Sequence, residues 1–468
     1  MTHKKTSASI SQHQKNISDA NRRKKQSKKS NKYLISNIDN ISIMEARVLI
    51  EYSEYRLESS NACLVLLLSL LLGRTCSNII DERHKLKLDR NKSNFEGYVF
   101  VEYPDITKIK KSEVSDNLEQ SKGKVLLPLP KHMTKGIEKF LNSNPEDINF
   151  NNVLKRINNK FKTRLTTNRI SRYMTHWMVN QNIDSANIGL IAGKSGDFIV
   201  SLYYYRVKVS KLLIIYESFL NHLYNESKFR FSKKSELYVG SHLVPTNTAI
   251  QNLFTSIKNT HNGACNQNDK HNAFVIYTIM LLFMATGHRP VTDPFGFLKC
   301  FCLLTGRVYL NEKNIDKHHE HRIIPLCNTA QKQLQNYIKY IEESKMKFML
   351  LSKELNHYFN GIQDSSMPLF FLINNHKVIQ ISESTFEEQI SLESKFYLKP
   401  NWQRHFLRSY LSTHNVKNNL INTWLGHDGI GGNVLSKFSS TKIGDLSCIS
   451  ELIDKAFEDL KIPVLSHK

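Results

Sequence analysis

The stretch HFLRSYLSTHNVKNNLINTWLGH, which runs from His405 to His427, decides what fold we expect for this chain. Its apolar residues recur at helical spacing on both sides of a polar break, so it predicts two consecutive helices. An earlier stretch, RISRYMTHWMVNQNIDSANIGLIAGK from Arg169 to Lys194, has the same pattern. Such a repeat bears on the whole fold, because a chain of related units has to be interpreted unit by unit.

Two further pairs of segments repeat in the same order along the chain. LLLSLLLGRTCSNII (66–80) matches TIMLLFMATGHRPVTDPF (278–295), since in both an apolar helix ends in glycine and an arginine follows. KVLLPLP (124–130) matches HRIIPLC (321–327). Three matching pairs in one order indicate two related lobes in tandem.

Most other segments have helical periodicity as well, and the strand candidates are few. They are GYVFVEY (97–103), KVLLPLP, GRVYL (306–310) and RIIPL (322–326), of which the last two predict a hairpin around a charged turn. We therefore expect a mainly α fold with small β-sheets, of the α+β class. The expected divisions are a basic disordered arm (1–40), an N-terminal lobe (41–230), a polar linker or helical connection (231–272) and a C-terminal lobe (273–468).

The chain carries a formal net charge of +23, which predicts attraction to a polyanion. Residues 1–32 contain ten Lys or Arg and one acid, Asp19, so much of the excess lies in this arm. Nucleic acid is the first candidate partner, because phosphate neutralisation by Lys and Arg dominates such binding. An anionic membrane surface is the alternative, and a tail that merely solvates the protein is an equal alternative for the arm.

The cysteines and the most apolar segment favour a cytoplasmic protein. Seven cysteines without a CxxC pair predict neither a disulfide framework nor a zinc site, and we expect reduced, mostly buried thiols. CLVLLLSLLLG, from Cys63 to Gly73, is too short to span a bilayer and too far from the first residue to be a secretory signal. It is expected to be a core helix.

The C-terminal lobe resembles the tyrosine recombinases, the phage-integrase family of DNA breaking and rejoining enzymes. The matching residues are Arg289 in ATGHRP, Lys317 before RIIPL, His405 and Arg408 in HFLR, and His427 in LGH. The resemblance implies a catalytic-type domain that binds double-stranded DNA, works in synaptic oligomers and needs no metal or organic cofactor. It also implies that the N-terminal lobe is a degenerate relative of the same domain.

The chemistry explains why these residue types are needed. Metal-free cleavage of a phosphodiester requires charge neutralisation at the non-bridging oxygens, and the forked guanidiniums of Arg289 and Arg408 suit that role. Lys317, on a hairpin turn, is a candidate general acid for the leaving oxygen. His405 and His427 are candidates for hydrogen bonds to the phosphate or for proton transfer.

Each of these residues also has a purely structural interpretation. Arg289 follows a helix, where a cation is favourable at the carboxyl end. Lys317 lies in the charged segment DKHHEHR, where most side chains are solvated, and His427 fits a core histidine. The order of the whole set favours the functional interpretation.

The expected nucleophile is missing from the C-terminal lobe. The position nine residues after His427 holds Ser436 where a tyrosine is expected, Phe438 follows two residues later, and no tyrosine occurs from His427 to the last residue. A serine hydroxyl does not replace a phenol in such a site, because its pKa is that of an alcohol. The C-terminal lobe is thus predicted to bind a phosphate without attacking it.

The N-terminal lobe contains the tyrosines that the C-terminal lobe lacks. Tyr203 stands nine residues after Lys194, in the segment GKSGDFIVSLYYYR, and is our candidate nucleophile. Arg74, Arg172 and Lys194 are the corresponding secondary site residues of this lobe. Core packing is the alternative role for the three consecutive tyrosines.

Three hypotheses about function follow. In the first, the chain is an integrase-like site-specific recombinase that acts in DNA integration or recombination of a mobile element by metal-free transesterification. In the second, it is a catalytically impaired, recombinase-derived DNA-binding protein with an accessory or regulatory role. In the third, it is a basic helical protein that binds RNA or a membrane.

Overall fold

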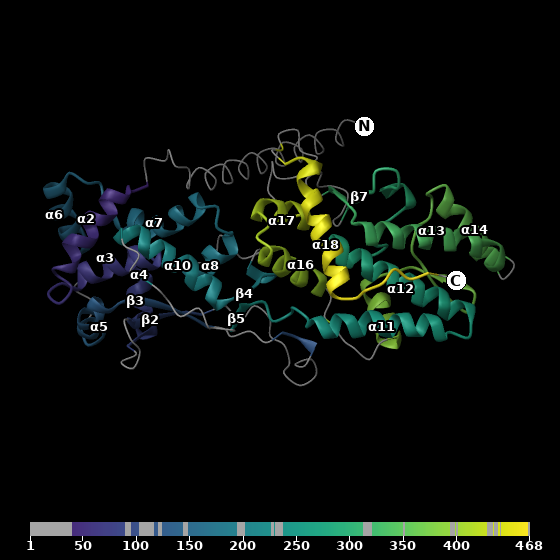
Figure 1. The fold of residues 1–468 in the computed structure, drawn as a ribbon, viewed down its shortest axis with the longest axis horizontal. Coiled ribbons are helices and arrows are strands. Elements are labelled where there is room, and N and C mark those ends of the chain that lie inside the picture. Colours follow the sequence, from purple (N-terminus) through teal and green to yellow (C-terminus); the bar gives the residue numbers. More distant parts are fainter. Residues whose placement is uncertain are drawn as a thin grey trace, which may run out of the picture. The chain divides into compact units, whose positions relative to one another are not determined.

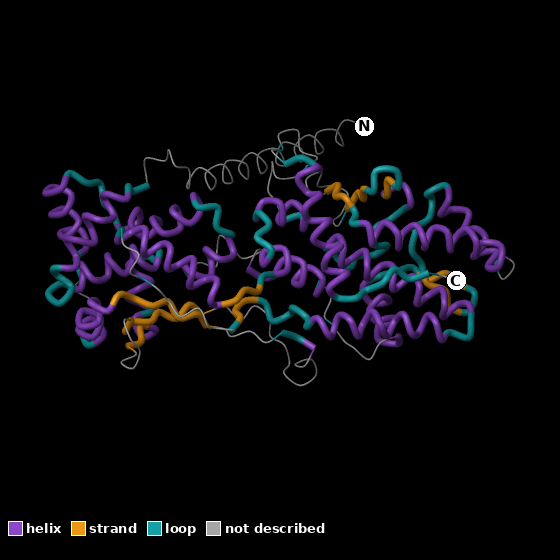
Figure 2. The backbone as a smooth tube through the Cα atoms, in the orientation of Figure 1, coloured by secondary structure: helices purple, strands orange, loops and turns teal. Residues whose placement is uncertain are grey.

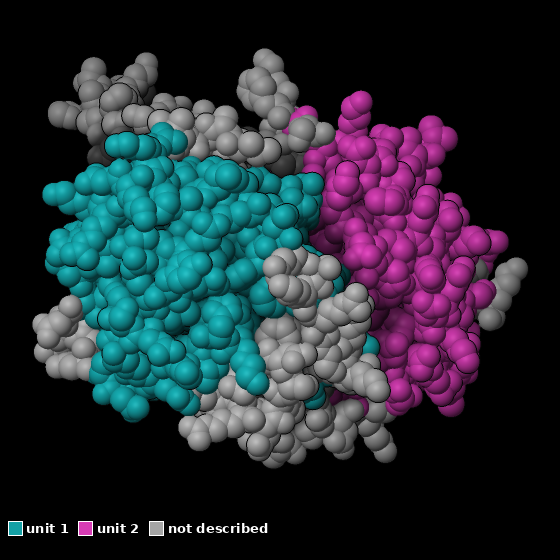
Figure 3. All heavy atoms as spheres, turned by 60° about the vertical axis from the view of Figure 1, so that its left-hand side comes forward, with its two compact units in different colours: residues 1–105, 122–202, 207–239 teal, residues 106–121, 203–206, 240–468 magenta. Residues whose placement is uncertain are grey.

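The computed structural model covers residues 1–468, and its described part forms two compact units, coloured teal and magenta in Figure 3. The first unit comprises residues 1–105, 122–202 and 207–239, and the second comprises 106–121, 203–206 and 240–468. The described residues are 40–88, 95–102 (backbone only), 117–119, 124–143, 148–193, 202–225, 229, 237–311, 321–349, 352–393, 398, 401–427, 434, 439 and 441–466.

The described part of the first unit consists of helices and one antiparallel sheet of order β1-β2-β3 (Figure 1). Its strands are β1 (Leu86–Leu88), β2 (Phe95–Glu102) and β3 (Lys124–Pro130). Its helices are α2 (Ile43–Glu54), α3 (Asn61–Leu72), α4 (Cys76–Asp81), α5 (Thr134–Leu141), α6 (Phe150–Phe161), α7 (Thr167–Asn180), α8 (Ser185–Ala192) and α10 (Val209–Tyr224), with short 3-10 turns η1 (Arg83–Lys85) and η3 (Lys131–Met133).

The described part of the second unit contains a three-stranded antiparallel sheet, order β6-β7-β8, and the hairpin β9-β10. The strands are β6 (Phe301–Cys302), β7 (Arg307–Leu310), β8 (Arg322–Pro325), β9 (Leu372–Asn374) and β10 (Lys377–Ile379). The helices are α11 (Asn247–Gly263), α12 (Gln267–Thr286), α13 (Asn328–Met349), α14 (Lys353–Gln363), α15 (Glu383–Glu393), α16 (Trp402–Thr413), α17 (Asn418–Leu425) and α18 (Ser447–Asp459), with 3-10 turns η5 (Leu298–Cys300) and η6 (Ile443–Leu446). Where the chain passes between the units, β4 (Arg206–Lys208) pairs with β5 (Tyr238–Gly240).

The predicted fold class is confirmed at the level of secondary structure, since helices dominate and the sheets are small and antiparallel (Figure 2). KVLLPLP is β3, and the predicted hairpin is formed by β7 and β8, with Val308 opposite Ile324. CLVLLLSLLLG lies in α3 and is buried from Cys63 to Leu72, as expected of a core helix. The segment 231–272 includes α11, whose apolar face belongs to the core of the second unit.

None of the helices in the described ranges combines the length and the apolar character needed to cross a membrane.

One expectation about the cysteines is wrong. All seven are free, but only Cys63, Cys76 and Cys327 are buried. Cys265, Cys302 and Cys448 are exposed and Cys300 is partly exposed, because they lie on the outer faces of short elements or in a loop; Cys302, for example, ends β6.

The two units share an order of elements in which glycine ends four helices. A buried helix ends at Gly73 or Gly287, a three-stranded sheet follows, and a later pair of helices ends at Gly193 or Gly426. The φ angles of these glycines are 63°, 62°, 64° and 67° in the order named. Only glycine adopts this left-handed conformation without a steric penalty, so it ends each helix sharply.

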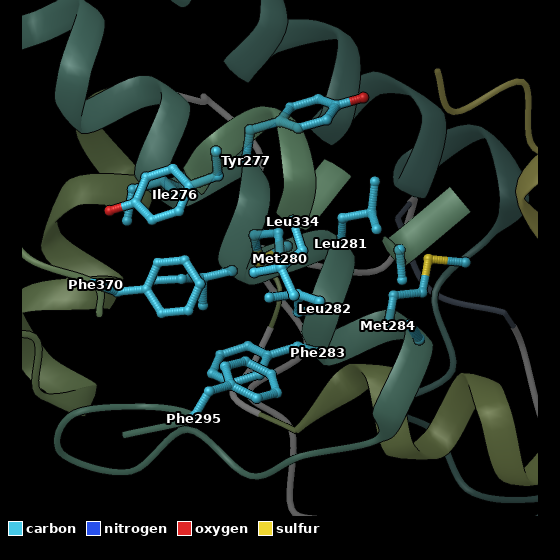
Figure 4. Packing of buried hydrophobic residues seen from close by; sticks show 14 of the residues in the cluster. Ile276, Tyr277, Met280, Leu281, Leu282, Phe283, Met284, Phe295, Leu334 and Phe370 are labelled. Atoms are coloured by element: carbon cyan, nitrogen blue, oxygen red, sulfur yellow. The ribbon is translucent and has the colours of Figure 1, made fainter. Parts of the chain in front are cut away.

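Helix α12 lies at the centre of the second unit because it is apolar on all sides. Every residue from His271 to Thr286 is buried. Figure 4 shows Met280, Leu282 and Phe283 of this helix packed with Leu334 and Phe295. A helix that is apolar all round has to be covered on all faces, and this fixes the place where its carboxyl end and the following turn lie.

The turn at Gly287 provides a test of this packing. A Cβ atom there would lie 2.6 Å from Leu425 Cδ2, in addition to the strain of φ +62°. We expect Gly287→Ala to destabilise the second unit by about 1–2 kcal/mol or more. The measurement is urea unfolding followed by tryptophan fluorescence in a Trp177→Phe background, in which Trp402 and Trp424 report on the second unit.

Gly263 supplies the matched control for this substitution. It ends α11 with nothing within 4 Å of an added Cβ, so Gly263→Ala should leave the unfolding midpoint nearly unchanged. Equal midpoints for the two alanine variants would contradict the proposed role of the Gly287 turn.

Candidate functional site

Helix α16 buries three basic side chains in the second unit. Arg404, His405 and Arg408 are all 0% exposed. Arg404 and Arg408 are four residues apart, so they lie on the same face of the helix. Buried guanidiniums are costly unless they are hydrogen-bonded, and their contacts therefore define the site.

Arg404 joins the two glycine turns of the second unit. Its Nη1 donates to the carbonyl oxygen of Gly287 at 2.6 Å, and its Nη2 donates to that of Leu425 at 2.6 Å. Nη2 also lies 2.6 Å from Nε2 of His427. One guanidinium thus connects the end of α12, the end of α17 and the predicted site histidine.

The other arginines reach the same region from three separate elements. Arg408 donates from Nη2 to Asn418 Oδ1 at 2.9 Å. Arg322, buried at the start of β8, places Nη2 at 3.5 Å from the carbonyl oxygens of Thr286 and Gly287. Arg289 is half-buried two residues after the Gly287 turn.

His427 lies among these four guanidiniums. Burial lowers its pKa well below the usual histidine range, and the positive charges of the arginines lower it further, Arg404 first, then Arg289, Arg408 and Arg322. A ring that is surrounded by cations is neutral at physiological pH. The electrostatic effect on His427 shows that positive charge concentrates here.

His405 is the second neutral histidine of the site. Its Nδ1 lies 2.6 Å from the hydroxyl oxygen of Ser241, which also accepts a hydrogen bond from the backbone N–H of Leu243 at 3.1 Å. Burial, with a smaller effect of Arg404, lowers the pKa of His405 to about 3. His405 therefore does not contribute positive charge near neutral pH.

The three consecutive tyrosines belong to the second unit, and Tyr203 and Tyr204 pack on these histidines. The ring centroids of Tyr203 and His405 are 5.1 Å apart, and those of Tyr204 and His405 are 4.7 Å apart. Tyr204 also stacks on His427, with centroids at 5.2 Å and an interplanar angle of 20°, and lies 5.1 Å from Arg404 Cζ. The candidate nucleophile segment is thus in the same chain and the same unit as the arginines.

Backbone and side-chain hydrogen bonds hold the tyrosine segment in place. The N–H of Arg206 donates to the Ser409 hydroxyl at 3.0 Å, and the Arg206 guanidinium pairs with Glu119 at 3.0 Å. The N–H of Ser241 donates to the carbonyl oxygen of Tyr205 at 2.8 Å. These contacts, all at Tyr205 and Arg206, hold the carboxyl end of the tyrosine segment in place.

The tyrosines differ in accessibility. Tyr205 is buried, accepts a hydrogen bond from the Ser412 hydroxyl at 3.2 Å and lies 5.0 Å from Arg408 Cζ. Tyr204 is buried as well, whereas Tyr203 is only half-buried. Burial, together with the neighbouring Tyr204, raises the pKa of the Tyr203 phenol. Tyr203 is the tyrosine that a large substrate can reach most easily.

The corresponding residues of the first unit form a different environment. Arg74 is buried and forms an ion pair with Glu82, which also accepts from Lys85 Nζ at 3.1 Å. Arg172 is half-buried on α7. The carboxylate at Arg74 neutralises the charge that an anionic substrate would need, so the two units differ in the electrostatics of this position.

The structure brings together Arg289, His405, Arg408, His427 and Tyr203 of the predicted set, and it places Arg74 and Arg172 in the other unit. Four sequence positions of interest, namely Lys194, Lys317, Ser436 and Phe438, lie outside the described residues.

The sequence reasoning missed three residues of this site. Arg404 had a signal, because it precedes Arg408 by one helical turn and adjoins the HFLR motif. Arg322 opens the predicted strand RIIPL, where it reads as an ordinary strand residue. Ser241 had no signal, since only the folded chain brings it to His405.

The cluster can bind an oxyanion. Guanidiniums remain charged and donate two parallel hydrogen bonds, which suits phosphate oxygens. Within the part of the chain that the structure describes, no group of three or more His, Cys, Asp or Glu side chains could hold a metal ion. Comparison with protein-family models, curated proteins and solved structures gives no match to this chain.

Proposed function

We propose that this chain is a DNA strand transferase of the tyrosine-recombinase type, an integrase-like protein that acts on double-stranded DNA of a mobile element in the cytoplasm. One observation carries the proposal: four arginines from three segments direct positive charge at His427, and Tyr203 and Tyr204 pack on the histidine pair His405 and His427. A phosphodiester is the substrate class that matches such a site, because it offers two non-bridging oxygens that share a negative charge beside an electrophilic phosphorus.

The proposed reaction is a metal-free transesterification. The phenol oxygen of Tyr203 forms a bond to phosphorus, and the bond between phosphorus and the 5′-oxygen of the next nucleotide breaks. The phenol loses its proton and the leaving 5′-oxygen gains one, with Lys317 as the general acid that the family resemblance implies. The arginines neutralise the charge on the non-bridging oxygens, and the phosphotyrosyl bond conserves the energy for rejoining.

In this proposal the two units have different functions within one protein. We infer that they are tandem lobes of the recombinase catalytic type, of which the second retains the phosphate site. The first lobe, in which Glu82 neutralises Arg74, would bind DNA. The tyrosine segment belongs to the second unit, together with the phosphate site. Assembly of several copies on DNA, as in the family it resembles, is part of the same proposal.

A second function is favoured by two observations about the nucleophile. The raised pKa of Tyr203 makes the phenolate less available, and no tyrosine follows His427 in the sequence. Both facts suit a recombinase-derived DNA-binding protein that has lost strand cleavage and acts beside a competent partner. Its arginines would still bind a phosphate.

Covalent trapping separates the two functions. The full chain is incubated with nicked duplexes made from DNA that flanks its own gene, so that cleavage releases a short fragment and cannot be reversed. A denaturing gel detects a protein–DNA adduct, and peptide mapping locates it. An adduct on the 203–205 segment supports the strand transferase, and binding without an adduct supports the accessory protein.

Arg289→Ala tests the phosphate site by DNA affinity alone. Loss of one charge-assisted contact is expected to weaken binding roughly ten-fold. The slope of log K against log salt should fall by about 1, because one phosphate contact fewer releases fewer counterions. Fluorescence anisotropy with a labelled duplex at several salt concentrations measures both quantities.

Arg289→Lys is the matched control, because it keeps the charge and removes the fork. Its salt slope should stay near that of the wild type, while adduct formation falls. An unchanged affinity and slope in Arg289→Ala would show that the cluster does not contact DNA phosphate.

A further inference from the structure

The contact between Arg404 and His427 determines where the imidazole carries its proton. Nη2 of Arg404 lies 2.6 Å from Nε2 of His427. A guanidinium has only donors and does not deprotonate in proteins, so Nε2 must be the acceptor. The neutral ring then carries its proton on Nδ1.

Arg404 cannot turn away from this arrangement. Its guanidinium is bound at 2.6 Å to the carbonyl oxygens of Gly287 and Leu425, and the residue is 0% exposed. An added Cβ at Gly287 would lie 4.0 Å from Arg404 Cγ, so the turn packs on the side chain itself. The donor at Nη2 is therefore preorganised, with the two glycine turns as its support.

Nδ1 of His427 is the atom that this arrangement leaves for a ligand. It is buried and has no hydrogen-bond partner within the described ranges of the chain. The positive charges of Arg289, Arg322, Arg404 and Arg408 surround the ring, and they favour an anionic acceptor over a neutral one.

We propose that Arg404 is a positioning residue that fixes His427 as a hydrogen-bond donor through Nδ1 to a non-bridging oxygen of the bound phosphate. Three donors of Arg404 are directed at Gly287, Leu425 and His427, and through the last of these Arg404 acts on the phosphate. The identity of the acceptor rests on the proposed function, whereas the position of the proton does not.

Nitrogen-15 NMR of the full chain, selectively labelled on histidine, tests the first part without DNA. The His427 signals are assigned by their loss in His427→Asn. We expect Nδ1 to be protonated and Nε2 to be an acceptor across pH 6–8. In Arg404→Lys, one ammonium cannot reach all three acceptors, so a mixture of both tautomers is expected. Arg307→Lys, at an exposed position of β7, is the control and should leave the spectrum unchanged.

A double-mutant cycle tests the second part. The side-chain amide of His427→Asn places a donor near the position of Nδ1, so it replaces the proposed function of the ring. We expect Arg404→Lys to lower adduct formation at least ten-fold in the presence of His427, and less than two-fold in the His427→Asn background. A merely structural Arg404 would give the same loss in both backgrounds.

The outcomes separate this proposal from the proposed function. Protonation of Nε2 in the wild type, or a tautomer that does not respond to Arg404→Lys in a variant with normal thermal unfolding, overturns the role of Arg404. If the tautomer behaves as expected and no variant forms an adduct, the role of Arg404 in orienting His427 stands and the strand-transferase function falls. The same cycle is then measured on DNA affinity, where equal losses in the two backgrounds overturn the phosphate contact of Nδ1.

Discussion

Tyr203→Phe is expected to lower the yield of the covalent protein–DNA adduct by at least about 10³-fold, because it removes the atom that forms the new bond to phosphorus. The ring contacts with His405 and Tyr204 do not require the hydroxyl, so folding and DNA affinity should stay close to those of the wild type. The measurement is the trapping assay on nicked duplexes, with duplex affinity determined on the same preparation.

The neighbouring tyrosines are the matched controls. Tyr205→Phe removes the hydrogen bond from Ser412 and should cost about 1 kcal/mol of stability, while adduct formation persists. Tyr204→Phe keeps the ring that stacks on His427 and should also retain the adduct. An adduct that vanishes only in Tyr204→Phe would move the nucleophile by one residue. Equal yields in all three variants would exclude this segment.

Acidification from pH 6.5 to pH 5 is expected to destabilise the second unit by about 3 kcal/mol through His271 and His405. Burial lowers the pKa of His271 to about 4 and that of His405 to about 3. In the unfolded chain both titrate near pH 6.5, so the unfolded state binds more protons throughout this window. The stabilisation is complete well above pH 6.5 and is lost as the pH falls, with a slope that approaches about 1.4 kcal/mol per pH unit for each ring near pH 5.

The pKa of His427 is depressed too, so His427 also makes the second unit less stable as the pH falls. Urea unfolding in the Trp177→Phe background at pH 7.5, 6.5 and 5.0 measures the effect. His271→Gln should remove about half of the pH dependence, although it also disturbs the bonds of His271 to Tyr340 and Phe371. His357→Gln, on the surface of α14, is the control and should leave the pH dependence of unfolding unchanged. A midpoint that is constant between pH 6.5 and 5.0 would refute the buried neutral state.

Much of the local structure could be predicted from the sequence, because it depends on neighbouring residues. The period of the apolar residues predicted α16, α17 and the buried helix α3. The prolines and β-branched residues predicted β3 and the β7–β8 hairpin. The limit of this approach shows between Ile43 and Leu72, where helical periodicity alone does not reveal the break between two helices. This stretch forms two helices, since Ser60 caps the second one and separates it from the first.

The candidate site could be predicted only in part, because some of its residues lie in short motifs and others meet only through contacts between distant segments. Arg289, His405, Arg408 and His427 lie in short motifs, so the sequence by itself indicated them and the missing tyrosine after His427. Contacts between distant segments follow from packing. Only the tertiary structure decided that Arg322 and Arg404 join this cluster and that Tyr203 and Tyr204 lie on its histidines, because burial of α12 and the glycine turns brings those segments together.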